Sequence, residues 1–242
     1  MQSRRWTGLL LAGVVAAAGW WAYLAYLAPY RVMPEARAEM AGDDLVAVEA
    51  SRWLEFSPAT REPRAGLVVY PETRVPPEAY APAARALAAE GYLVAVVPVP
   101  FGVPSIGAGR AAEVILAHPG VRRWAVAGHG EGGEVAAGYA RRDDDISGLV
   151  LWDALPAPGL DLSGLSRLSA MVVLAGDRGP EAEEARDRLP EKTWETVVEG
   201  ATHAAFGWYV DPTRPPLGSV SRNDLTVKLV EATLRVLRAI DG

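Results

Sequence analysis

Apolar and polar positions form long alternating blocks along this chain, and the blocks predict a regular succession of strands and helices. Short apolar runs have the length of strands, and they are continuous rather than polar at every second position. Runs of Ala, Leu and Glu with near-helical spacing separate them, often opened by Pro or closed by Gly. The expected strands are 65–70, 92–99, 122–128, 147–153, 169–176 and 194–200, and the expected helices are 76–91, 107–120, 131–140, 180–189 and 221–240.

This order predicts an α/β fold. Strands that are apolar along their whole length are covered on both faces, as in a parallel sheet, and the helices between them provide the cover. We therefore expect one doubly wound, mostly parallel sheet over residues 44–242. A short antiparallel pair, 45–50 and 52–56, is expected to lead into it.

The N-terminus has a different pattern. Residues Trp6–Ala28 carry no charge, and 23 residues of helix span about 35 Å, enough to cross a hydrocarbon core of about 30 Å. Arg4 and Arg5 precede the run, which favours a domain outside the cytoplasm. We expect one transmembrane helix within residues 1–30, acting as an anchor or uncleaved signal, and a linker over 31–43. The alternative is a signal peptide cleaved near Ala16–Ala18, which would give a secreted protein.

Composition narrows the chemistry. The net charge of −6 is spread along the chain, so no basic surface predicts nucleic-acid binding. The absence of cysteine excludes disulfides, thiolate zinc sites and a cysteine nucleophile. Any histidine chemistry depends on His118, His129 and His203. We expect no cofactor and no metal, and the sequence does not indicate an oligomeric state.

The loops that follow the strands carry the candidate chemistry, because sites in open parallel sheets lie at the carboxyl ends of the strands. The segment "AGHGEGG" joins a strand to a helix and resembles the nucleophile turn G-x-S-x-G, with Gly130 at the nucleophile's place. Loops containing Asp177 and His203 follow later strands. This order of turn, acid and histidine is that of the Ser, Asp and His of α/β-hydrolases.

Separated motifs make this resemblance specific. The segments "VVYPETRVPPEAYAPAARALAAEGYLV", "AGHGEGG" and "EGATHAAFGWY" are similar to those of compact, lidless, dienelactone-hydrolase-like α/β-hydrolases from bacteria, over about residues 44–240. The resemblance implies that Asp177 is the triad acid and His203 the base, with Gly130 in the nucleophile's place. It also implies oxyanion donors at Glu131 and in the loop of Glu72, where the family has Gly-Gly.

Glycine at position 130 decides the functional prediction. It offers no atom for acyl-enzyme formation, so serine-type hydrolysis through this position is impossible. The favoured interpretation is a catalytically impaired member that binds a small ligand, such as an ester or lactone, or a partner. One alternative is a weak esterase or lactonase in which His203, oriented by Asp177, activates water. The other is a purely structural, membrane-tethered domain.

Overall fold

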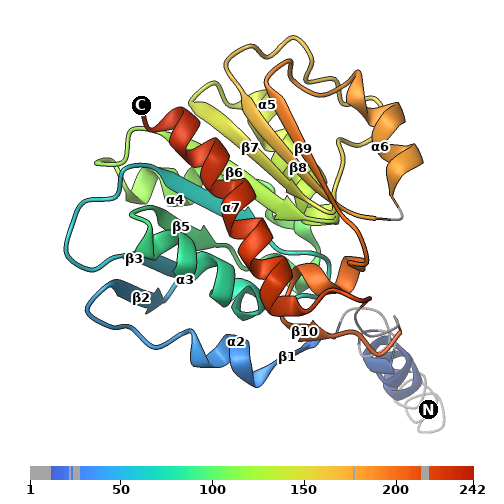
Figure 1. Cartoon of the computed structure of the whole chain (residues 1–242). Helices are drawn as coiled ribbons and strands as arrows, with labels where there is room; N and C mark the ends of the chain where they lie inside the picture. Colours follow the sequence, from blue (N-terminus) through green and yellow to red (C-terminus); the bar gives the residue numbers. More distant parts are fainter. Residues whose placement is uncertain (1–11, 22, 24–27, 177, 214–217) are drawn as a thin grey trace, which may run out of the picture.

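The computed structural model describes residues 12–21, 23, 28–176, 178–213 and 218–242 (Figure 1). Within them, one sheet has eight strands in the order β2-β3-β5-β4-β6-β7-β8-β9. The strands are β2 (Val46–Ala50), β3 (Leu54–Pro58), β4 (Gly66–Tyr70), β5 (Leu93–Val96), β6 (Trp124–His129), β7 (Ile146–Trp152), β8 (Ser169–Ala175) and β9 (Thr193–Val198).

The sheet has the predicted mixed character. From β5 to β9 all neighbours are parallel, while β2 and β3 form an antiparallel pair and β3 joins β5 in antiparallel register. Every residue of the central strands β4 and β6 is buried, as the continuous apolar runs indicated. The prediction of an α/β, mostly parallel sheet is therefore confirmed.

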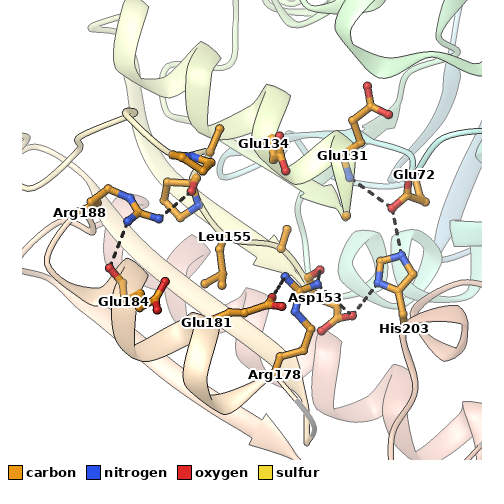
Figure 2. Close-up of a pocket in the computed structure, with 15 residues that line it drawn as sticks. Glu72, Glu131, Glu134, Asp153, Leu155, Arg178, Glu181, Glu184, Arg188 and His203 are labelled. Atoms are coloured by element: carbon orange, nitrogen blue, oxygen red, sulfur yellow. Dashed lines mark hydrogen bonds and ion pairs between the residues drawn. The ribbon is translucent and has the colours of Figure 1, made fainter.

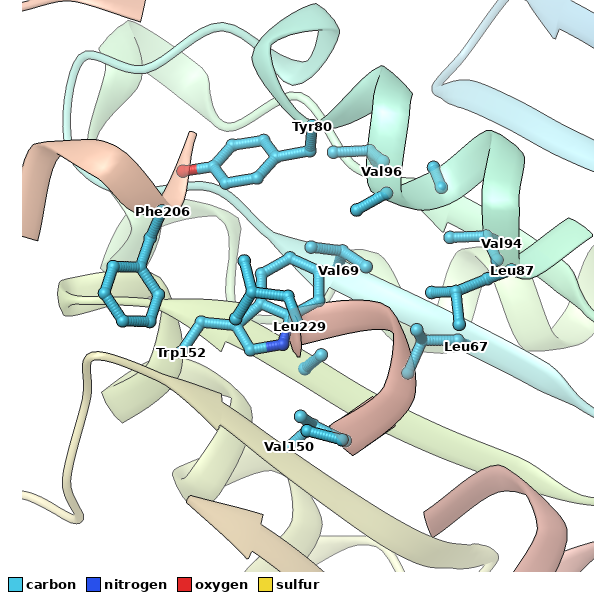
Figure 3. Close-up of a cluster of buried hydrophobic side chains, with 14 of the residues drawn as sticks. Leu67, Val69, Tyr80, Leu87, Val94, Val96, Val150, Trp152, Phe206 and Leu229 are labelled. Carbon is cyan, nitrogen blue, oxygen red and sulfur yellow. The ribbon is translucent and has the colours of Figure 1, made fainter. Parts of the chain in front are cut away.

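Helices cover both faces of the sheet. Helices α3 (Ala81–Ala89) and α7 (Arg222–Ile240) pack on one face, and α4 (Arg110–Ala117) and α5 (Glu131–Arg142) pack on the other (Figure 1). Each face of the sheet has its own hydrophobic core: the first core lies under α3 and α7, and the second core lies under α4 and α5. Figure 3 shows the first core, in which Leu87 of α3 and Leu229 of α7 face Leu67 and Val150 of the sheet. Helix α6 (Gly179–Arg186) follows β8, and its Ala182 is part of the second core.

The segment 31–43, expected to be a linker, is part of the folded domain. It forms β1 (Arg31–Val32), which pairs with β10 (Tyr209–Val210), and the short helix α2 (Pro34–Ala38). Val32 and Ala36 are buried in the first core. The linker prediction missed this because two buried side chains four residues apart are too weak a signal to mark an element.

The predicted anchor is only partly described. Residues 12–21 are helical, but the rest of the run 6–28 lies mostly outside the described residues. No helix in the described part has the length and apolar character needed to cross a membrane. The segment that follows is attached to the domain, since the amide of Tyr30 donates to the carbonyl of Arg74 at 2.8 Å. The membrane span therefore stays a prediction.

Candidate functional site

The candidate site lies where the strand order changes direction. After β4 the chain adds β5 on one side and then β6 on the other, so the loops after β4 and β6 diverge and leave a crevice at their carboxyl ends. Glu72 follows β4, Gly130 follows β6 and Asp153 follows β7. His203 begins the short 3-10 helix His203–Phe206 after β9, and all four residues line one cavity (Figure 2).

Gly130 has the backbone of a nucleophile turn. Its φ of 51° and ψ of −120° lie in a region that residues with a Cβ occupy only under strain. Helix α5 begins at the next residue, and Gly130 itself lines the cavity. A Cβ built on Gly130 would overlap Oε2 of Glu72 and lie 2.9 Å from Cε1 of His203. The space that a serine side chain needs is therefore occupied.

Nδ1 of His203 is held by the carboxylate of Asp153. The distance from this nitrogen to Oδ2 of Asp153 is 2.6 Å, and Asp153 is fully buried and is the first residue after β7. Asp177, expected to fill this role, lies outside the described residues. Among the described residues, the carboxylate that contacts Nδ1 of His203 follows β7, and the role of Asp177 stays a prediction.

The carboxylate of Asp153 is fixed in its ionised form. Burial opposes ionisation, but hydrogen bonds from His203 and from the amide of Ala175, at 2.9 Å, hold its pKa below the ordinary value. Arg178 adds a positive charge 3.8 Å away. The backbone of Asp153 has a φ of 44°, in the left-handed region. Such strain costs about 1–3 kcal/mol and is characteristic of functional positions.

Glu72 supplies the second carboxylate to His203. Its Oε2 lies 3.0 Å from Nε2 of the imidazole and also accepts the amide of Glu131 at 3.2 Å. Its Oε1 accepts the amide of Thr73 at 2.5 Å. The two side chains are mostly buried, with 16% and 18% of their surfaces exposed. Figure 2 shows the resulting row, in which the imidazole lies between Asp153 and Glu72.

Two carboxylates change what the imidazole can do. Burial lowers the pKa of His203, but the hydrogen bonds and charges of Asp153 and Glu72 outweigh it and raise the pKa above its ordinary value. Both ring nitrogens face carboxylate oxygens, so both carry protons when the carboxylates are ionised. In this arrangement His203 is a proton donor, whereas a serine hydrolase needs a base at this point.

The predicted oxyanion donors are both engaged. The amide of Glu131, which follows the nucleophile turn as expected, donates to the Glu72 carboxylate. The amide of Glu72 itself donates to the hydroxyl of Tyr80 at 3.0 Å. Neither amide is free for a substrate oxygen in this conformation.

His129 has a positioning role. Its Nε2 lies 3.1 Å from the carbonyl of His203, and its Nδ1 lies 3.0 Å from the hydroxyl of Tyr80. Because a carbonyl only accepts, Nε2 donates, and Nδ1 accepts the hydroxyl proton of Tyr80. This relay connects the backbones of Glu72 and His203.

Three side chains of this site are of the types that bind metal ions, so the site was compared with a metal centre. Glu72, His129 and His203 offer ligand atoms within 4.8 Å of one another. However, both ring nitrogens of His129 have the protein partners described above. Its ring also packs against that of His203, with centroids 4.4 Å apart and planes inclined by 35°. Both nitrogens of His203 face carboxylates as well, so the imidazoles are already engaged and the donor set does not fit a metal centre.

The cavity beside Glu72 has a volume of 550 Å³. Its wall combines the apolar segment 154–158 with charged side chains of α5 and α6. The arginines in the wall are engaged, since Arg178 pairs with Glu181 at 2.8 Å and Arg188 donates to the carbonyl of Pro156 at 3.2 Å. The size suits a small ligand.

A family model for the alpha/beta hydrolase family matches residues 66–214, which include the nucleophile turn, Asp153 and His203. The chain belongs to the alpha/beta hydrolase family. No curated protein sequence matches it.

Solved hydrolase structures have the same fold. A ferulic acid esterase from Streptomyces cinnamoneus has a TM-score of 0.54 and 21% identity, and the match covers 76% of this chain and 68% of the esterase. A dienelactone hydrolase-like promiscuous phosphotriesterase from metagenomic libraries has a TM-score of 0.61 and 17% identity, covering 82% of this chain and all of the other. At these identities the likeness concerns the fold.

The sequence analysis did not predict two carboxylates that contact His203 in this candidate site. Asp153 directly follows an apolar strand, the same signal that singled out Asp177, but it was read as the end of that strand. Glu72 was considered only for its backbone amide. The signal that it matters was available, because Glu72 replaces a glycine of the family pattern while Gly130 replaces the serine.

Proposed function

We propose that this chain is a membrane-anchored α/β-hydrolase-fold protein, impaired in ester hydrolysis, which binds a small ligand in the 550 Å³ cavity. The observation that carries the proposal is the position of the Glu72 carboxylate. It fills the space of the missing nucleophile and contacts both the imidazole of His203 and the amide of Glu131.

Three features support impairment. Gly130 has no nucleophilic atom. The amides of Glu131 and Glu72, which would stabilise the oxyanion, have other acceptors. His203 holds its proton between two carboxylates instead of accepting one. Since loss of a triad residue alone costs about 10⁴–10⁶-fold in rate, the combination leaves serine-type turnover at background.

Ligand and location follow from different parts of the chain. The similar solved structures include an esterase and a dienelactone hydrolase-like protein, so a neutral ester or lactone is the class of ligand to test. The uncharged run 6–28 behind Arg4 and Arg5 supports a single-pass anchor with the domain outside the cytoplasm.

The test uses the full-length chain in detergent. We expect p-nitrophenyl acetate and dihydrocoumarin to be hydrolysed no faster by the native chain than by His203→Ala. Dihydrocoumarin should raise the melting temperature of the native chain, since a ligand at 100 times its Kd stabilises by about 2.7 kcal/mol. The variant Leu155→Trp, which fills the cavity wall, should lose this shift. Hydrolysis well above background that depends on His203 would contradict the proposal.

A weak hydrolase is the second candidate, and the 2.6 Å bond between His203 and Asp153 favours it. That bond orients the imidazole as a water-activating base requires. The candidate needs Glu72 to release Nε2. It predicts a small ester hydrolysis rate that is lost in Asp153→Asn and rises in Glu72→Gly.

A further inference from the structure

We propose that residues 98–109, the apolar loop, form a second membrane contact of this chain, and that Phe101 and Ile106 insert into the surface of the bilayer beside the anchor. The inference rests on the proposed function, because it takes the uncharged run 6–28 as the anchor. It goes further by assigning one edge of the folded domain to the membrane.

Composition and exposure are the first argument. The apolar loop joins β5 to α4 and contains no charged residue. Phe101 and Ile106 nevertheless have 69% and 59% of their surfaces exposed. The backbone of Phe101 has a φ of 55°, which a bulky residue adopts only under strain. Contact with water gives no return for a strained, exposed aromatic side chain, whereas the interface of a bilayer favours aromatic rings.

The attachment of the anchor's end is the second argument, because it fixes where the bilayer lies. Ala28 is the last residue of the uncharged run, and its carbonyl accepts Nε of Arg74 at 2.8 Å. The amide of Arg74 donates to the carbonyl of Gly102, also at 2.8 Å, and Gly102 is the residue after Phe101. One arginine therefore joins the end of the anchor to the tip of the apolar loop, so a bilayer that holds the anchor lies next to Phe101.

The residues around this arginine are of the types found at a membrane–water interface. The guanidinium of Arg74 lies over the ring of Tyr30, 4.5 Å from its centroid. Tyr30 in turn stacks on Tyr209, with ring centroids 5.4 Å apart. Tyrosine rings are enriched at the level of the headgroups, and arginine side chains extend toward them. This cluster is therefore the expected neighbour of a loop that enters the interface.

The backbone of the loop tip suits insertion. Pro100 and Pro104 have no N–H group. The amides of Gly102, Val103 and Ile106 donate to carbonyls within the same segment, at 3.0–3.2 Å. A backbone polar group that leaves water without a partner costs free energy, and these groups already have partners. The tip can therefore enter an apolar layer with little loss of hydrogen bonding.

The apolar loop lies on the same edge of the sheet as the candidate site. Ser105 and Ala108 line a cavity of 390 Å³ together with Glu131 and Glu134, and these two glutamates also line the 550 Å³ cavity. A bilayer against the loop therefore lies beside the candidate site. Because carboxylates are repelled by anionic headgroups, the bilayer that fits this edge is a zwitterionic one, such as phosphatidylcholine.

The test measures which solvent surrounds the loop. The chain has no cysteine, so one introduced cysteine places an NBD fluorophore at one position of the full-length chain in phosphatidylcholine vesicles. On Ser105→Cys, an exposed position of the loop, the fluorophore should be quenched by nitroxide-labelled acyl chains and protected from aqueous iodide. On Leu116→Cys it should show the reverse. Leu116 is also exposed, but it lies at the opposite edge of the sheet, because α4 leads back to the start of β6.

A double variant tests whether the two apolar side chains make the contact. With the fluorophore on Ser105→Cys, Phe101→Asp with Ile106→Asp should lose most of the nitroxide quenching and become accessible to iodide, since charged side chains are costly in the acyl region. Leu116→Asp, which changes an exposed apolar residue elsewhere, is the matched control and should leave the quenching unchanged. Quenching of the double variant that equals that of the native loop would overturn the inference.

A third position separates this inference from the proposed function. A fluorophore on Val15→Cys, within the uncharged run, should be quenched by the nitroxide lipid. If it is not, the anchor fails and the inference fails with it. If Val15→Cys is quenched and Ser105→Cys is not, only the loop contact fails. Iodide protection of Ser105→Cys that grows with the protein-to-lipid ratio, without nitroxide quenching, would place a second copy of this chain on the loop and overturn the inference.

Discussion

Restoring the serine is the most discriminating perturbation of this site. In Gly130→Ser the new Cβ would overlap Oε2 of Glu72, so the hydroxyl and the carboxylate compete for one space. The positive φ of 51° adds a strain of about 1–3 kcal/mol for a residue with a Cβ. We expect the single variant to lose melting temperature and to remain at background in ester hydrolysis. In the double variant Glu72→Gly with Gly130→Ser, the hydroxyl faces Nε2 of His203 and the amide of Glu131 becomes free.

The expected gain follows from the groups that are present. A complete triad is worth on the order of 10⁶ in kcat, as measured in a serine protease. One oxyanion donor is worth about 10²–10³, and the amide at position 72 stays directed at Tyr80. The double variant should therefore exceed the native chain by about 10³–10⁴-fold in ester hydrolysis, well below a complete enzyme of the family.

The assay is kcat/KM for p-nitrophenyl acetate with the full-length chain in detergent. Glu72→Gly alone and the triple variant with His203→Ala serve as controls and should stay at background. The reasoning is refuted if Gly130→Ser alone is as active as the double variant. It is equally refuted if the double variant is folded, keeps the bond between Asp153 and His203, and gains nothing.

Three further outcomes follow from the geometry. Asp153→Asn keeps the shape of the side chain, and asparagine tolerates the positive φ at this position. This variant should lower the pKa of His203 measured by NMR, because it removes the negative charge next to Nδ1, whereas Asp177→Asn should leave that pKa unchanged. The reverse result would assign the acid role to Asp177. Because the folded pKa of His203 is raised, its stabilising contribution is complete below about pH 6.5 and is lost as pH rises through the folded value. Urea unfolding should therefore show a falling free energy over that range, and a flat profile in His203→Gln. Gly128→Ala, in β6, places a methyl group 2.5 Å from a backbone nitrogen of α5 and should lower the free energy of unfolding by at least about 1–3 kcal/mol. In the control Gly138→Ala, on α5 itself, the new methyl group meets nothing closer than 3.7 Å, so this variant should be neutral or stabilising.

The fold was predictable because its signals are local and repeated. Strands β4 and β6 are buried at every position and, apart from His129, carry no charged or strongly polar residue, and only a sheet covered on both faces buries such runs. Gly91 ended the helix before β5 as expected, and its φ of 104° explains the need for glycine. The packing of Val32 and Ala36 was not predictable in this way. Their burial depends on β10 and the first core, which are distant in sequence.

The site was predictable only in its outline. Gly130, Glu131 and His203 lie at one end of the sheet, as the order of the motifs required. The choice between Asp153 and Asp177 was not available from sequence, because each comes after an apolar run in the chain and the carboxyl ends of parallel strands meet at one edge of a sheet. The direction of an imidazole, and the amides that hold a carboxylate, are fixed by backbone geometry around them. No periodicity reports that geometry.

Steric exclusion is what makes Glu72 and Gly130 one feature of the molecule. The observed position of the Glu72 carboxylate requires a residue without Cβ at 130, because any side chain there would overlap Oε2. Conversely, a glycine at 130 with glycine at 72 would leave Nε2 of His203 facing an empty space. The site is therefore a distinct arrangement and not a serine site with one atom removed. It retains a strained backbone at Asp153, which costs about 1–3 kcal/mol, and an imidazole that is hydrogen-bonded through both nitrogens. A purely structural domain gains nothing from that strain, whereas a site that must hold the imidazole of His203 in one orientation between Asp153 and Glu72 requires it.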